Sequence, residues 1–96
     1  MAPARDAARN PRWPPLFSER QWKRLVGRLR LTRRQSQVAE CLCRDLKAGT
    51  IARELSLSLD SVRHHSKELF IKLSVNTRLG VVLCLLHDSR GRKQAT

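Results

Sequence analysis

The side chains best suited to chemistry lie on one predicted helix in the second half of the chain. Arg63, His64 and Lys67 are spaced i, i+1 and i+4, on the face opposite the apolar Val62 and Leu69. Basic and hydrogen-bonding side chains on one helix face can contact phosphate oxygens and the edges of bases. The chemistry that this spacing favours is binding of nucleic acid.

A second helix must precede this one to position it. Residues 49 or 50 to 56 form a short amphipathic segment, and the turn Ser56-Leu57-Ser58 joins it to a helix over 59–73. We expect Leu57 to pin the turn to the core and Ser58 to cap the second helix. Two helices joined in this way describe a helix-turn-helix, whose second helix enters a groove about 12 Å wide.

Metal binding and catalysis find no support in the sequence. Cys41 and Cys43 are two residues apart, about 200° around a helix, so they cannot share a metal ion. The three cysteines are expected to be reduced packing residues. There is no glycine-rich phosphate loop and no GxSxG motif. We therefore expect no enzyme, no metal, no cofactor and no small-molecule ligand site.

The charge of the chain makes nucleic acid the first partner to consider. Its 96 residues include 20 Lys and Arg against 8 Asp and Glu, a net charge of +12. Residues 1–30 hold eight basic and two acidic side chains, and residues 89–96 hold three basic ones. Residues 31–88 carry only +3. Most of the charge thus supports a general attraction to nucleic acid and lies outside the predicted reading helix.

No segment resembles a membrane span or a secretion signal. The longest apolar run, Val81 to Leu86, has six residues against the roughly 18 that a span requires. We expect a cytoplasmic protein without a membrane partner.

The sequence predicts an all-α fold. All four prolines precede residue 16, and residues 16–88 show helical rather than alternating apolar periodicity. Capping-box patterns begin helices at Ser18 with Gln21, and at Thr32 with Gln35, the second helix reaching about Leu46. The predicted organisation is a disordered basic arm over 1–15, an extra helix over 16–30, a DNA-binding domain over 31–88 and a basic tail over 89–96.

The last predicted helix runs from Thr77 to about His87 and is apolar all round from Val81 to Leu86. We expect Leu79, Val82, Leu83 and Leu86 to face the core, which leaves Val81, Cys84 and Leu85 to be covered. Either the N-terminal helix with Trp22 or a second copy of the chain can cover them. Trp22 is expected to anchor that N-terminal helix to the core.

Residues 31–78 resemble the LuxR/GerE-type DNA-binding domain without a gap. The KLSVNTR segment that follows the second helix of the motif is the specific part of the resemblance. Four positions, Leu57, Ser61, Arg63 and Leu69, are conservative replacements. The positions that keep the family's letters are Leu31, Thr32, Arg34, Val38, Leu42, Leu46, Ile51, Ala52, Leu55, Ser58, Val62, His65, Lys72, Leu73, Val75 and Arg78.

Three departures from the family pattern stand out. Gln35 replaces a glutamate, and Asp45 replaces the glycine that ends the first family helix, so we expect Lys47 or Ala48 to form that turn with an ordinary backbone. The run over 47–50 lacks the serine or threonine that usually meets a phosphate.

The resemblance implies a four-helix domain, preceded here by the extra helix, and a role for several residues. It implies base contacts by Arg63, His64 and Lys67, with Arg63 able to pair with guanine O6 and N7. It also implies dimerisation through the last helix, where the residues left uncovered form the interface. The implied backbone contacts are Lys47, Ser61 and Lys72, and the implied interface residues are Val81, Cys84 and Leu85.

The expected function is a transcriptional regulator that binds duplex DNA as a homodimer, with RNA polymerase as a further candidate partner. Two other classes stay open, a module like region four of a sigma factor and a degenerate helix-turn-helix that binds protein. For Arg63 and Lys67 the alternative is an ordinary solvated helix face. His65, on the apolar side, is expected to be structural and bonded to a backbone carbonyl.

Overall fold

The computed structural model describes residues 16–90, which contain five helices and no strand. The arm predicted over 1–15 and most of the tail predicted over 89–96 lie outside the described residues. The all-α fold with an extra N-terminal helix is confirmed. The helices are α2 (Glu19–Leu29), α3 (Arg33–Cys43), α4 (Ala48–Leu55), α5 (Leu59–Leu73) and α6 (Arg78–Ser89).

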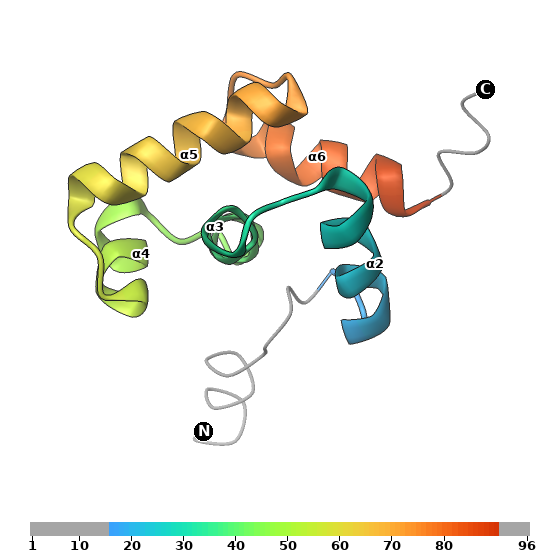
Figure 1. Ribbon diagram of the computed structural model, residues 1–96, viewed down its shortest axis with the longest axis horizontal. Helices are drawn as coiled ribbons and strands as arrows, with labels where there is room; N and C mark the ends of the chain where they lie inside the picture. Colours follow the sequence, from blue (N-terminus) through green and yellow to red (C-terminus); the bar gives the residue numbers. More distant parts are fainter. Residues whose placement is uncertain (1–15, 91–96) are drawn as a thin grey trace.

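The helices surround α3, which lies at the centre of the molecule (Figure 1). Helix α5 crosses over α3 and α4, and α6 packs against α3, α5 and α2. Helices α2 and α4 lie at opposite ends of the domain, on either side of α3 (Figure 1). The core takes residues from all five helices, among them Trp22, Val38, Ile51, Leu69 and Leu85. Trp22 is buried and packs against Phe17, as its predicted anchoring role requires.

Side-chain caps begin four of the five helices. Both predicted capping boxes are present, with the Ser18 and Thr32 hydroxyls each accepting from a backbone N–H 3.1 Å away. Ser58 and Thr77 cap α5 and α6 in the same way. Helix α4 differs, since Lys47 precedes it without a side-chain cap. The first N–H groups of α4 are therefore left without a capping side chain.

Four helices are followed within two residues by a left-handed residue that is not glycine. Arg30, Asp45, Ser56 and Ser74 have φ between 56° and 61°. The next residue in each case is apolar, and its N–H bonds back to a carbonyl five residues earlier, as in a Schellman motif. Those apolar residues, Leu31, Leu46, Leu57 and Val75, all pack on the core.

The turn after α3 differs from the one expected at Lys47 or Ala48. Asp45 itself takes the left-handed conformation, with φ of 61°, a backbone that favours glycine. Its N–H bonds to the Leu42 carbonyl and that of Leu46 to the Cys41 carbonyl. Helix α3 therefore stops at Cys43, before the predicted end near Leu46.

The orientation predicted for the last helix is wrong. Val81 and Leu85 are fully buried at 0% exposure, whereas Leu79 and Leu83 are 62% and 55% exposed. Asp88, one turn after Leu85, is also buried, and Arg28 of α2 donates to its carboxylate and its carbonyl. This ion pair and the packing of α2 on α6 fix which side of the helix faces inward, since the residues from Val81 to Leu86 are apolar all round.

Candidate nucleic-acid interface

The turn between α4 and α5 is built as the sequence indicates. Ser56 adopts φ of 56°, the Leu57 N–H bonds to the Ala52 carbonyl over 2.8 Å, and Leu57 packs on the core. Ser58 then caps α5 by accepting from the Ser61 N–H at 3.0 Å. Its hydroxyl also donates to the Ser61 hydroxyl at 3.0 Å, which places Ser61 at the first turn of α5. The expected phosphate-contact side chain thus lies beside the turn.

Arg63, His64 and Lys67 are all exposed on α5, while Val62 and Leu69 are buried behind them. The structure therefore brings the three predicted base-contact residues to one side of one helix. Arg63 and Lys67 border a groove of about 450 Å³ with an apolar floor that includes Val62 and Ile51. The groove runs between α5 and the start of α4, so both helices present side chains to the same surface.

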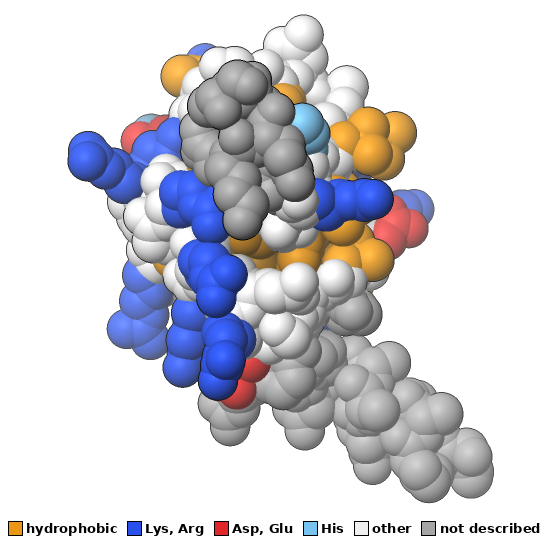
Figure 2. Space-filling view, turned by 90° about the vertical axis from the view of Figure 1, so that its right-hand side faces the viewer, with side chains coloured by type: hydrophobic (Ala, Val, Ile, Leu, Met, Phe, Trp, Pro, Cys, Tyr) orange, Lys and Arg blue, Asp and Glu red, His pale blue; other side chains and the backbone are white. Residues whose placement is uncertain are grey.

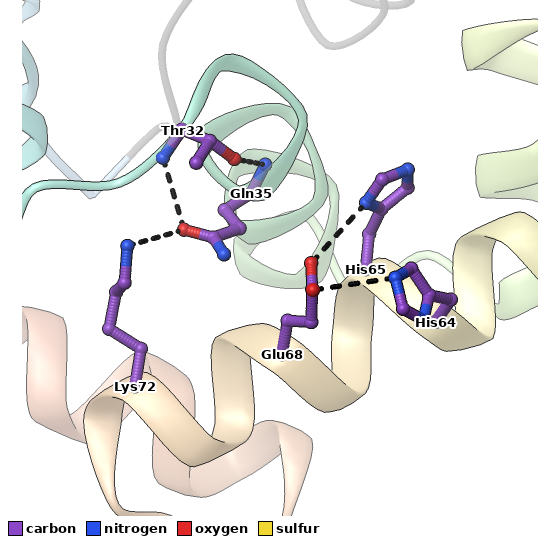
Figure 3. A network of polar contacts seen from close by, with 6 residues as sticks. All are labelled: Thr32, Gln35, His64, His65, Glu68 and Lys72. Carbon is purple, nitrogen blue, oxygen red and sulfur yellow. Dashed lines mark hydrogen bonds and ion pairs between the residues drawn. The ribbon is translucent and has the colours of Figure 1, made fainter.

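Glu68 is an acidic neighbour that the sequence reasoning missed. Its carboxylate lies 3.3 Å from His64 Nε2 and 3.9 Å from His65 Nδ1 (Figure 3). The i+4 spacing from His64 was the available signal. His65 contacts the Glu68 carboxylate. The centres of the His65 and His64 rings lie 5.5 Å apart. An acidic group beside His64 weakens attraction to phosphate and disfavours close approach of a second anion.

The Lys72 side chain makes its hydrogen bonds within the domain. Its ammonium donates to the Arg30 carbonyl at 2.6 Å and to Gln35 Oε1 at 2.9 Å (Figure 3). Gln35 is buried, and the same oxygen accepts from the Thr32 N–H at 3.0 Å. Lys72 therefore joins the end of α5 to the end of α2 and the start of α3, and Gln35 completes that junction where the family has glutamate.

Arg78 closes the segment that carries the family resemblance. Its guanidinium donates to the Leu46 carbonyl, just after the left-handed turn at Asp45. It thereby ties the start of α6 to the end of α3. Arg78, the arginine of the KLSVNTR segment, thus helps to position α6 against α3.

Lys47 and the start of α4 form the second part of the candidate interface. Lys47 is exposed and precedes a helix whose first turn contains Gly49 and Thr50. Uncapped N–H groups at a helix start bind anions, and a lysine beside them adds charge. Although the family hydroxyl is missing here, the backbone of α4 can still meet a phosphate.

A polar cluster lies between α3 and α4, in which Glu40 and Arg44 are half-buried and Glu54 is exposed. Arg44 pairs with Glu54 at 3.1 Å, and Glu40 lies one turn before Arg44. Burial raises the pKa of the Glu40 carboxyl to about 7, against the opposing effect of Arg44 and with a further contribution from Glu54. Glu40 Oε2 has no hydrogen-bond partner among the described residues.

The cysteines behave as packing residues in the described part of the chain. All three are free, Cys41 is buried, and burial raises the pKa of the Cys43 thiol to about 12. A thiol of this kind is a poor nucleophile because it stays protonated. Among residues 16–90 no group of three or more His, Cys, Asp or Glu is arranged to hold a metal ion.

No single helix between residues 16 and 90 is long and apolar enough to cross a membrane. Helices α5 and α6 meet the length and composition of a span only when taken together, and they are bent by 46° at the break between them.

Comparison with known proteins defines the class. The model of the family described as bacterial regulatory proteins of the luxR family (GerE) matches residues 29–85. This is more than half of the chain, so the chain belongs to the luxR family of bacterial regulatory proteins. The family match confirms the resemblance carried by residues 31–78.

A curated relative comes from Aeromonas salmonicida, where it is described as "Putative HTH-type transcriptional regulator in exeN 3'region". It is 43% identical over 53 residues, which cover 55% of this chain and 27% of the relative. The chain therefore spans about a quarter of the length of that relative. No solved structure matches the chain significantly.

Proposed function

We propose that this chain is a DNA-binding transcriptional regulator that reads duplex DNA with α5. The observation that carries the proposal is the exposed trio Arg63, His64 and Lys67 on the helix that follows the α4–α5 turn. An α-helix fits the major groove, where arginine pairs with guanine O6 and N7. The name of the A. salmonicida relative, a regulator of the helix-turn-helix type, supports the same role.

The positioning contacts come from the start of α4 and of α5. Lys47 and the uncapped N–H groups of α4 are suited to one phosphate, and the Ser61 hydroxyl is suited to another. Lys72 is the exception among the implied backbone contacts, because its ammonium is held by Arg30 and Gln35. We assign Lys72 a role in holding α5 against α2 and α3.

We also propose that two copies associate through the outer face of α6. Leu79 and Leu83 are exposed one turn apart, and Val82 and Leu86 flank them half-buried. This face replaces the interface of Val81, Cys84 and Leu85 expected from the sequence, since Val81 and Leu85 are already in the core. A self-complementary apolar face suits a symmetric dimer whose two α5 helices meet successive half-sites.

Fluorescence polarisation with the full chain and a labelled random-sequence duplex tests the DNA-binding proposal. We expect the logarithm of the affinity to fall linearly with the logarithm of salt concentration, by about 0.9 per phosphate neutralised. Arg63→Gln/Lys67→Gln is expected to bind more weakly and with a smaller slope. Salt-independent or absent binding would favour a helix-turn-helix module that binds protein.

A further inference from the structure

Helix α2 carries the densest positive charge among the described helices. It has four basic side chains against one acidic in 11 residues, whereas α5, the proposed reading helix, has three against two. The family match begins at residue 29, so the family model covers none of α2 except its last residue. The charge on α2 thus needs an explanation separate from the helix-turn-helix.

The basic residues of α2 form one exposed stripe, here named the α2 stripe, made of Arg20, Lys23 and Arg24. Trp22 and Leu25 are buried on the opposite side of the helix, so the stripe points away from the core. Figure 2, which views the molecule from the side on which α2 and α6 lie in Figure 1, shows Lys and Arg side chains in a column along one side.

Most of this charge is not used within the domain. Lys23 pairs with Glu19 at 3.7 Å, but both side chains are more than half exposed, so the pair contributes little. Arg28 is left out of the stripe because it pairs with Asp88 of α6. Arg20 and Arg24 have no acidic partner among the described ion pairs.

Gly27 leaves the helix backbone uncovered on this side of α2. It lies three residues after Arg24 and seven after Arg20, which puts it on the stripe side of the helix. Glycine is less favourable than alanine in a helix interior, yet a Cβ at Gly27 would meet nothing within 4 Å. Without a side chain at this position, a DNA strand can approach the backbone of α2 closely.

We propose that the α2 stripe is a second, sequence-independent contact to the phosphate backbone of duplex DNA, outside the segment that α5 reads. This rests on the proposed function. The length from Arg20 to Gly27 is about 10 Å, along which one DNA strand presents about three phosphates. Arginine guanidinium groups bind phosphate oxygens bidentately. Because α2 and α4 lie at opposite ends of the domain, the phosphates at α2 are distinct from those at α4 (Figure 1).

The test uses the full chain, a random-sequence duplex of about 40 base pairs and polarisation at several salt concentrations. Arg20→Gln/Arg24→Gln is expected to reduce the salt slope by about two and to weaken binding about tenfold near 150 mM salt. The control is Arg33→Gln, an exposed arginine on the first turn of α3. A slope that changes no more per charge removed on α2 than in this control would overturn the proposal.

Gly27→Ala supplies a readout that a merely structural role would not move. The variant is expected to unfold at higher temperature and yet to bind the duplex several-fold more weakly. Unchanged binding with raised stability would contradict the close approach.

The outcome for α2 is separable from that for α5. If the wild-type chain binds and the α2 variants bind like it, only the α2 proposal fails. If Arg63→Gln/Lys67→Gln binds like wild type while the α2 variants do not, only the reading role of α5 fails. A wild-type chain that binds no duplex would overturn both.

Discussion

The Lys72 ammonium donates a hydrogen bond to Gln35 Oε1 at 2.9 Å, which joins the last turn of α5 to the first turn of α3. The amide oxygen of Gln35 also completes the capping box with Thr32. One buried side chain thus caps a helix and fixes the end of the proposed reading helix. The junction adds a polar contact to the packing of α5 against α3.

We therefore expect Lys72→Met to lower the free energy of unfolding by about 1–2 kcal/mol, since a charged hydrogen bond is lost and Gln35 loses a donor. The salt slope of duplex binding should stay that of the wild type. Urea denaturation and polarisation measure the two quantities. A slope smaller by about one, with unchanged stability, would show that Lys72 binds a phosphate instead.

Asp45 holds a left-handed backbone that costs a non-glycine residue free energy. We expect Asp45→Gly to raise the free energy of unfolding by about 1 kcal/mol, as measured in urea. Asp45→Ala is the control, since it removes the carboxylate and keeps the Cβ. Equal stability of the two variants would contradict the backbone explanation.

Glu40 should make stability depend on pH. Because burial raises its pKa from 4.5 to about 7, the folded state binds more protons than the unfolded chain between these values. Stability should then fall as pH rises from about 4.5 to 7 and level off above. The expected contribution, after allowance for solvent screening, is about 1–2 kcal/mol.

Glu40→Gln removes this contribution, so it should stabilise the protein more at pH 8 than at pH 5. Denaturation in urea at the two pH values measures the difference. Glu19→Gln is the matched control, because Glu19 is exposed in the first turn of α2. A gain for Glu40→Gln that is the same at both pH values would rule out the titration of Glu40 as the cause.

The outer face of α6 should control association. Leu83→Glu is expected to shift the sedimentation of the protein toward the monomer with little loss of stability, since Leu83 is 55% exposed. Leu85→Ala, by contrast, should cost about 2–5 kcal/mol because Leu85 is fully buried. Unchanged association in Leu83→Glu would argue against this face as the interface.

Local patterns in the sequence predicted the elements well. Capping boxes at Ser18 and Thr32, and the turn with Leu57, depend on residues three to five apart, so spacing alone reveals them. The exposure of Arg63 and Lys67 followed in the same way from the burial of Val62 behind them.

The features that local sequence patterns did not predict depend mostly on contacts between residues far apart in the chain. Because residues 81–86 of α6 are all apolar, their spacing does not indicate which side of the helix is buried. The Arg28–Asp88 pair that orients α6 joins residues 60 apart in sequence. The contact between Lys72 and Gln35 spans 37 residues. The left-handed turn at Asp45 was missed because a non-glycine residue rarely adopts it.

Selection of bound sites from a random duplex library tests the central claim most directly, namely that α5 reads base sequence. The account predicts an enriched motif arranged as two inverted half-sites about one DNA turn apart. Selection with Arg63→Ala should lose preference at one position of each half-site, a discrimination of about 1–3 kcal/mol. A wild-type chain that enriches no motif, or an Arg63→Ala chain that enriches the same motif equally well, would contradict it.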